Sequence, residues 1–282
     1  MKKILVPCDF SQPSKEAFRF ALELAVFSKG EIFVVHAIEV PLMYETAFGI
    51  QPYPVDPELT KRMEEQATQA FQKMKEMYHP PVPVAIHFQL LYDFVLPSIR
   101  SFIQENGIDL VIMGTTGASG LAEFFIGSNT EKVVRFSPIP VIALRKARTH
   151  GGIQNIVFPS TLELNQSDLM DHVIKLQGFF QAKLHIVTIN TPENFKADAE
   201  AHEALQEFAK HYKLTNYTLN FRNNFTERDG ILNFAEEIQA DMIAMATHSR
   251  KGLKHFFMGS VAESVVNHLD CLVWTYTMSN EQ

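Results

Sequence analysis

Short apolar runs alternate with longer amphipathic segments along the first half of the chain. Runs such as Ile4–Val6 and Ile32–Ile38 have the length and composition of buried strands. Between them, apolar residues recur every three or four positions in a segment that Ser11 or Ser14 can cap, which predicts a helix. Alternation of strand and helix favours a doubly wound, mostly parallel α/β sheet. The expected strands are 4–6, 32–38, 84–90, 110–113 and 140–144. Four helices are expected: one begins near Ser11, a second begins at Asp56-Pro57, a third covers 94–104, and a fourth includes 130–135.

The second half of the chain repeats the first. Residues 109–134 and 241–266 are identical at 12 of 26 aligned positions, where unrelated segments would share about two. The start of the chain also recurs, because Ile4–Pro7 matches Ile156–Pro159. A repeat of this length indicates two copies of one structural unit. Each half is therefore expected to form its own mostly parallel five-stranded sheet.

This repeat predicts two domains, residues 1–148 and 153–282, with a solvated connector at 146–152. The first half is longer because it carries an extra loop, Glu39–Val55, without an evident structural pattern. Loops of this length are usually functional or disordered. The loop follows the second expected strand, so it is expected either to cover a ligand site or to pack on the other half.

Composition narrows the class of protein. With 46% apolar residues among 282, the chain is not largely disordered. Its 32 acidic residues outnumber 25 basic ones, which argues against a general nucleic-acid-binding protein. Two cysteines cannot build a disulfide framework and suit a reducing compartment. No apolar run approaches the ~18 residues of a membrane span. We therefore expect a soluble cytoplasmic protein with neither nucleic-acid nor membrane partners.

The motif that carries chemistry follows the fourth expected strand. Gly114-Thr-Thr-Gly117 comes first, and Gly127-Ser128 follows nine residues later, directly before a helix. Glycine allows a phosphate to approach main-chain N–H groups closely. Ser128 and Glu131 form a capping box at the start of that helix, where free N–H groups and the helix dipole favour an anion. The motif predicts a phosphate-binding site.

The spacing G-x2-G-x9-G-S resembles the nucleotide-binding signature of the universal stress protein family. Two further segments also resemble that family, namely Ile4–Ser11, as its opening strand and loop, and His36–Ile38, as the end of its second strand. The segments occur in the family's order, and the chain has two halves. The sequence is thus similar to tandem-type universal stress proteins, whose domains have a Rossmann-like fold of the adenine nucleotide alpha hydrolase type.

The resemblance implies an ATP site in the first half, with or without Mg²⁺ or Mn²⁺. Asp9 would face the ribose or a phosphate-bound metal, although a cap for the following helix is an alternative role. The backbone of Ala37 would meet the adenine edge, and the start of the last helix would hold the phosphates. No catalytic residue and no metal ligand is assigned. The implied cofactor-binding residues are Pro7, Asp9, Ala37, Met113, Gly114, Thr116, Gly117, Gly127, Ser128, Asn129 and Thr130.

The second half departs from this motif. Its Gly259-Ser260 pair remains, but three other positions differ. A side chain at either glycine turn would stand where a phosphate must approach, so we expect ATP in the first half and no nucleotide, or a different ligand, in the second. The second half is also more acidic, with a net charge of −6 against −1 for residues 1–148. The aligned differences are Asp9 with Thr161, Gly114 with Ala246, and Gly117 with Ser249.

The expected function is that of a cytoplasmic ATP-binding protein in the stress response. Because no residue is evidently placed as a general base, we expect nucleotide-dependent interaction rather than rapid catalysis, with slow ATP hydrolysis at most. One alternative is a nucleotide-free interaction or scaffold protein. Another is a weak metal-dependent ATPase in which Asp9 helps to hold Mg²⁺ or Mn²⁺.

Members of the family pair through their fifth strands. By resemblance, Val141–Leu144 and Leu272–Thr275 are expected to join the two halves as an intramolecular pseudo-dimer. This pairing would hide two strand edges that could otherwise recruit other chains. A further homodimer of whole chains stays open.

Overall fold

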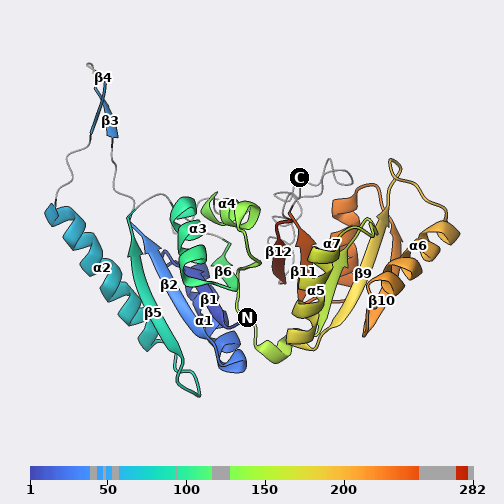
Figure 1. Cartoon of the computed structure of the whole chain (residues 1–282), viewed down its shortest axis with the longest axis horizontal. Coiled ribbons are helices and arrows are strands. Elements are labelled where there is room, and N and C mark those ends of the chain that lie inside the picture. The colour runs from blue at the N-terminus through green and yellow to red at the C-terminus, as the bar shows by residue number, and fades with distance from the viewer. Residues whose placement is uncertain are drawn as a thin grey trace.

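Two α/β halves lie side by side in the computed structural model of the chain (Figure 1). The structure describes residues 1–38, 43–46, 49–52, 57–92, 95–115, 128–247 and 271–278.

Strands and helices alternate through the first half as the apolar pattern predicts, with bounds within two residues of those expected. Ser11 is the N-cap of the first helix, and its side chain accepts a hydrogen bond from the Ser14 N–H. The elements are β1 (Lys3–Pro7), α1 (Gln12–Ser28), β2 (Glu31–Ala37), β3 (Met43–Thr46), β4 (Gly49–Pro52), α2 (Pro57–Glu76), β5 (Ala85–Leu91), α3 (Val95–Asn106), β6 (Leu110–Gly114), α4 (Ser128–Phe136) and β7 (Val141–Leu144).

The second half follows the same order of elements after a short 3-10 helix, η1 (His150–Gly152). Its elements are β8 (Asn155–Pro159), α5 (Ser167–Phe180), β9 (Lys183–Asn190), α6 (Asp198–His211), β10 (Tyr217–Asn223), α7 (Glu227–Glu237), β11 (Met242–Ala246) and β12 (Leu272–Tyr276).

The strands of both halves form one ten-stranded sheet in the order β10-β9-β8-β11-β12-β7-β6-β1-β2-β5. Neighbouring strands within each half pair in parallel. The halves meet where β12 pairs antiparallel with β7, with Trp274 opposite Ile142. This confirms the expected α/β fold and the expected pairing of the two fifth strands, and each edge strand of that pair is covered by the other.

Helices cover both faces of the sheet. One apolar cluster packs α1, α2, α5 and α6 against one face, and the other packs α3, α4 and α7 against the opposite face. Successive strand residues point to opposite faces, so Ile4 and Val6 belong to the first cluster and Leu5 to the second. Both clusters include residues of both halves, so the core continues across the β7–β12 junction. Among the described helices, none combines the length and apolar character that crossing a membrane requires.

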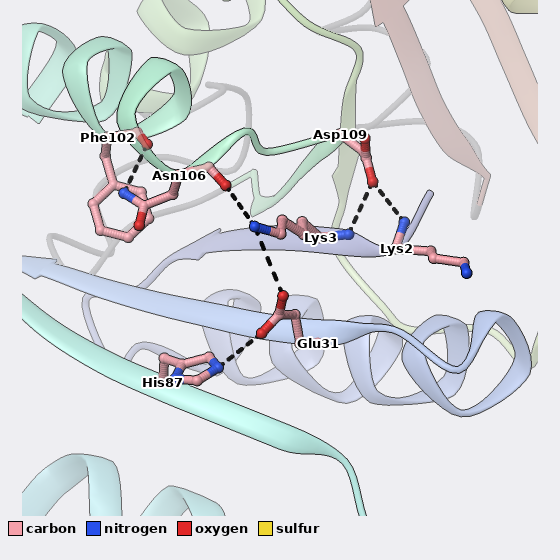
Figure 2. A network of polar contacts seen from close by, with 7 residues as sticks. All are labelled: Lys2, Lys3, Glu31, His87, Phe102, Asn106 and Asp109. Atoms are coloured by element: carbon pink, nitrogen blue, oxygen red, sulfur yellow. Dashed lines mark hydrogen bonds and ion pairs between the residues drawn. The ribbon is translucent and has the colours of Figure 1, made fainter.

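One aspartate carboxylate fixes the start of the first strand in each half. Asp109 Oδ2 accepts hydrogen bonds from the main-chain N–H groups of Lys2 and Lys3, at 2.7 and 3.0 Å (Figure 2). Asp241, which aligns with Asp109 in the repeat, accepts equivalent bonds from Gln154 and Asn155, at 2.9 and 3.0 Å. The internal repeat thus preserves a structural contact at the amino ends of the strands.

The same end of the first half carries a second polar network. Lys3 Nζ donates to the main-chain oxygen of Asn106 at 3.0 Å and lies 3.9 Å from Glu31 Oε1. His87 Nε2 lies 2.9 Å from the other carboxylate oxygen of Glu31. Figure 2 shows these contacts linking β1, β2 and β5 to the end of α3. They stabilise the amino ends of the strands.

The connector between the halves is held more firmly than the sequence suggests. Arg145 and Lys146 are exposed as expected, but Ala147 is buried. Its N–H donates to Glu16 Oε2 at 2.8 Å, and its carbonyl accepts from Arg19 at 3.2 Å.

Beyond Ala147 the connector contacts the second half as well. Arg148 forms an ion pair of 2.6 Å with Asp241. The His150 ring stacks on Phe27 with centroids 3.6 Å apart, and its Nε2 donates to the Phe179 carbonyl at 3.1 Å. The expectation of a solvated connector is therefore wrong for Ala147, Arg148 and His150, because each of them contacts residues far away in sequence.

The extra loop of the first half contains two strands that the sequence pattern did not predict. β3 and β4 pair antiparallel, with Met43 opposite Pro52 and Thr46 opposite Gly49. They form a separate two-stranded sheet, which projects from the first half on the side away from the second (Figure 1). A hairpin satisfies its main-chain groups locally, so it forms without the apolar face that would mark it in sequence.

Candidate functional site

The carboxyl ends of three parallel strands bring four of the predicted site residues to one edge of the first half. Pro7 is the last residue of β1 and Ala37 the last of β2, while Met113 and Gly114 end β6. β1 pairs in parallel with both β2 and β6, so these ends are neighbours. Ligands of doubly wound sheets bind beyond this edge.

Asp9 lies two residues beyond β1 and is exposed. Its Oδ1 accepts hydrogen bonds from the Ser11 N–H at 3.0 Å and from the Ser11 hydroxyl at 2.5 Å. Ser11 in turn caps α1. The carboxylate thus positions the helix cap, and the alternative structural role for Asp9 has a physical basis here.

Gly114 packs against the first turn of α1. A Cβ atom on Gly114 would lie 2.5 Å from the carbonyl carbon of Pro13 and 2.7 Å from both its Cβ and its oxygen. Side chains do not approach a backbone this closely, so glycine is required by the α1–β6 packing. The glycine motif predicts a phosphate in this space, whereas the neighbour of Gly114 in the structure is Pro13.

The start of α4 is held against the end of β6. The hydroxyl of Thr130 donates to the carbonyl oxygen of Gly114 at 2.7 Å, and Thr130 is buried. Asn129 is exposed, and Ser128 is the first residue of the helix. Thr116, Gly117 and Gly127, also predicted for this site, lie outside the described residues.

Two residues without a predicted role, Phe10 and His36, contact each other, and Phe10 directly follows Asp9 in the chain. The Nδ1–H of His36 donates to the Cys8 carbonyl at 2.7 Å, and the rings of Phe10 and His36 lie 4.9 Å apart. Phe10 adopts a left-handed backbone with φ of 61°. Such a conformation is uncommon for a bulky residue, and nothing in the local sequence indicates it.

Cys8 is part of the core at this edge. Its Sγ lies 3.4 Å from the Ser14 hydroxyl and 3.8 Å from the sulfur of Met74. Burial raises the pKa of the Cys8 thiol to about 11. A thiol that stays protonated at neutral pH is a poor nucleophile, so Cys8 packs here as a small apolar residue.

The corresponding edge of the second half holds a cavity of about 310 Å³. It is lined by the carboxyl ends of β8, β9 and β11, by Phe221 of β10, and by the starts of α5 and α7. Thr161 and Ala246, which replace Asp9 and Gly114, both line it. Ser249 and the Gly259-Ser260 pair lie outside the described residues. Within the described part of the chain, no group of three His, Cys, Asp or Glu side chains could hold a metal ion.

Comparison with known proteins finds one family in both halves. The model of the universal stress protein family matches residues 1–145 and 152–276. Universal stress protein MJ0531 of Methanocaldococcus jannaschii is 30% identical over 148 residues, which are 52% of this chain and 84% of that protein. A crystal structure of a universal stress protein from Archaeoglobus fulgidus superimposes with a TM-score of 0.68 at 20% identity, covering 99% of this chain and 97% of the other.

A smaller relative has been solved with a ligand. This universal stress protein, in complex with cAMP, is 19% identical and covers 45% of this chain and 98% of its own, with a TM-score of 0.36. Because the family model matches both halves, the chain belongs to the universal stress protein family and carries two of its domains in tandem.

Proposed function

We propose that the first domain binds ATP and that this cytoplasmic protein acts in the stress response through nucleotide-dependent interactions. The observation that carries the proposal is the hydrogen bond from Thr130 to Gly114, which holds the start of α4 at the carboxyl end of β6. Pro7 and Ala37 end the neighbouring strands on this edge. A helix start, a carboxylate and three strand ends are thereby gathered beside one another.

The two parts of ATP need different partners, and this edge offers both. Main-chain N–H groups at the start of α4, together with the helix dipole, favour the phosphates. Asp9 already accepts two hydrogen bonds from Ser11, but a carboxylate has room for further donors. A ribose hydroxyl can therefore bind it as well.

Charge and family membership also support the proposal. The first 148 residues carry a net charge of −1, so this half repels a polyphosphate less than the second half does, at −6. Nucleotide binding occurs in the family, since one member has been solved with cAMP.

A divalent ion would fit this site together with the nucleotide. The described residues offer no three-ligand metal cluster, so Mg²⁺ or Mn²⁺ would be held mainly by phosphate and water oxygens, with Asp9 as the carboxylate nearby. Hard oxygen ligands are those that Mg²⁺ prefers. When bound, the ion would neutralise part of the phosphate charge.

Rapid hydrolysis is not part of the proposal. Asp9 and His36 lie at this edge, and both already form hydrogen bonds within the chain. Asp9 accepts from the Ser11 hydroxyl, and His36 donates to the Cys8 carbonyl. A general base must be positioned to take a proton from the attacking water. Engaged in this way, the two side chains support binding with slow turnover at most.

Calorimetry of the full chain with Mg²⁺–ATP tests the proposal. We expect one ATP per chain and about tenfold weaker binding for Asp9→Ala, while Thr161→Ala, the matched change in the second domain, leaves the affinity unchanged. Two ATP molecules per chain would contradict the asymmetry. Absence of binding would favour the nucleotide-free scaffold, and fast phosphate release that depends on Asp9 would favour an ATPase.

A further inference from the structure

We propose that the cavity of the second domain binds a small organic cation with an apolar body. The cavity occupies about 310 Å³ at the carboxyl edge of the sheet, which is within the range of small-molecule sites. This inference concerns the second domain and does not depend on ATP binding by the first.

The floor of the cavity is apolar. Phe158 and Leu169 line it from β8 and α5, Met245 from β11 and Ile231 from α7. Each of these side chains is almost fully buried. Such a floor accepts a hydrocarbon or aromatic group and offers no hydrogen bond to a phosphate.

The second domain carries its carboxylate at a different position of the repeat from the first domain. In the repeat, Glu227 aligns with Val95 and Thr161 with Asp9. The first domain therefore has its acid after the first strand and an apolar residue at the start of α3. The second domain has a neutral residue after β8 and its acid at the start of α7, where Glu227 lines the cavity. This exchange changes the chemistry that the pocket can recognise.

Glu227 is suited to a positively charged or donating head group. It is half-buried, and its Oε1 accepts a hydrogen bond of 3.4 Å from Asn194. Burial raises the pKa of Glu227, and the nearby charge of Glu193 adds to this effect. A ligand ammonium group would offset both the desolvation and the like-charge repulsion.

Lys196 is the one cationic side chain among the described lining residues, and its charge would favour an anion instead. Its main-chain N–H donates to Asn190 Oδ1 at 2.8 Å, which fixes the backbone of this loop. Against this one cation stand Glu227, Glu193 and a half with a net charge of −6. The balance of charge favours a cationic ligand.

Two exposed phenylalanines lie in the loops that are next to lining residues. Phe195 is 75% exposed and lies between two lining residues of one loop, while Phe225 is 88% exposed and lies two residues before Glu227. The loops are joined by a hydrogen bond of 3.0 Å from the Asn224 N–H to the Asn190 carbonyl. Exposed aromatic side chains beside a cavity are typical of a binding site for an apolar group, which agrees with the floor.

Methionine methyl NMR on the full chain can locate binding without a known natural ligand. Met245 and Met278 line the cavity, and Met113 lies at the edge of the first domain. The probes are 3-phenylpropylamine, 3-phenylpropan-1-ol and 3-phenylpropanoate, which share a body and differ in the charge of the head. Signals are assigned by single Met→Leu changes, and ATP is titrated separately.

We expect the amine to shift the Met245 and Met278 signals with an affinity about tenfold higher than that of the carboxylate, and the alcohol to lie between them. Glu227→Gln should reduce the ratio to about one, whereas Glu236→Gln, the same change at an exposed site of α7, should not. A preference for the carboxylate that Lys196→Gln abolishes would overturn the proposal. So would shifts in none of the three titrations, or equal affinities. Failure of ATP to shift Met113 would count against the proposed function alone.

Discussion

Arg148 and Asp241 form an ion pair of 2.6 Å that joins the connector to the second half. The same carboxylate accepts two main-chain hydrogen bonds at the start of β8. Asp109 makes the equivalent two bonds in the first half, where no described residue supplies an arginine partner of this kind. The two aspartates therefore allow the same pair of main-chain hydrogen bonds to be compared with an ion pair, at Asp241, and without one, at Asp109.

Asp241→Ala is expected to destabilise the protein by about 2–4 kcal/mol, and Asp109→Ala by about 1–2 kcal/mol, because the former also leaves Arg148 without this partner. Urea unfolding measures both. Trp274 is the one tryptophan of the chain and lies on β12, so its fluorescence reports on the second half. A double-mutant cycle of Asp241→Ala with Arg148→Ala should give a coupling of about 1 kcal/mol. Equal losses for the two aspartates would show that the ion pair contributes nothing.

Gly114→Ala is expected to cost about 2–3 kcal/mol, because the new Cβ would overlap the Pro13 backbone. The matched change is Gly178→Ala in α5, where no atom lies within 4 Å of the added Cβ. Alanine has the higher helix propensity, so this variant should gain up to about 1 kcal/mol. Thermal unfolding followed by circular dichroism measures the loss of stability in Gly114→Ala and the gain in Gly178→Ala. A neutral Gly114→Ala variant would contradict the close α1–β6 packing.

Thr130→Val is expected to lower stability by about 1–2 kcal/mol, since it leaves the carbonyl of the half-buried Gly114 without its 2.7 Å donor. Under the proposed function it should also weaken ATP binding several-fold, because the start of α4 is no longer fixed. Thr130→Ser keeps the hydroxyl and should keep the affinity. Calorimetry measures the ATP affinity of both variants. Equal affinities would show that this hydrogen bond does not contribute to nucleotide binding.

The Cys8 thiol should make stability depend on alkaline pH. Its pKa is raised by burial from 9.0 to about 11 in the folded protein, so the folded state binds the proton more tightly than the unfolded state does. The contribution is full below pH 9 and is lost as pH rises toward 11, by about 2–3 kcal/mol in total. Tyrosines titrate in this range too, so the difference between wild type and Cys8→Ala isolates the thiol. Parallel stability–pH curves for the two proteins would refute this account.

Much of the fold is predictable because its signals are local. Apolar runs such as Ile4–Val6 and the repeated segment 109–134 define strands and an internal repeat without any knowledge of tertiary contacts. The pairing of Val141–Leu144 with the β12 strand follows from family resemblance, and the structure confirms it.

What could not be predicted depends on partners far away in sequence. The side chain of Glu16 reaches the Ala147 N–H across 131 positions, so the connector reads as solvated in the sequence alone. The neighbour of Gly114 is Pro13, on another element, and the glycine therefore reads as part of a phosphate site. The strands that end at this edge are predicted to within two residues, while the site residues and the ligand stay a prediction.

The β7–β12 pairing has a thermodynamic consequence. Both strands belong to one polypeptide, so their association does not depend on protein concentration, and dilution cannot separate the halves. A symmetric dimer of identical chains must change both of its sites with each mutation. Here a substitution at Thr161 or Glu227 changes only the edge of the second half. The shared sheet leaves the edge of the first half unchanged. Every molecule thus carries one copy of each of two unlike edges, at a fixed one-to-one ratio.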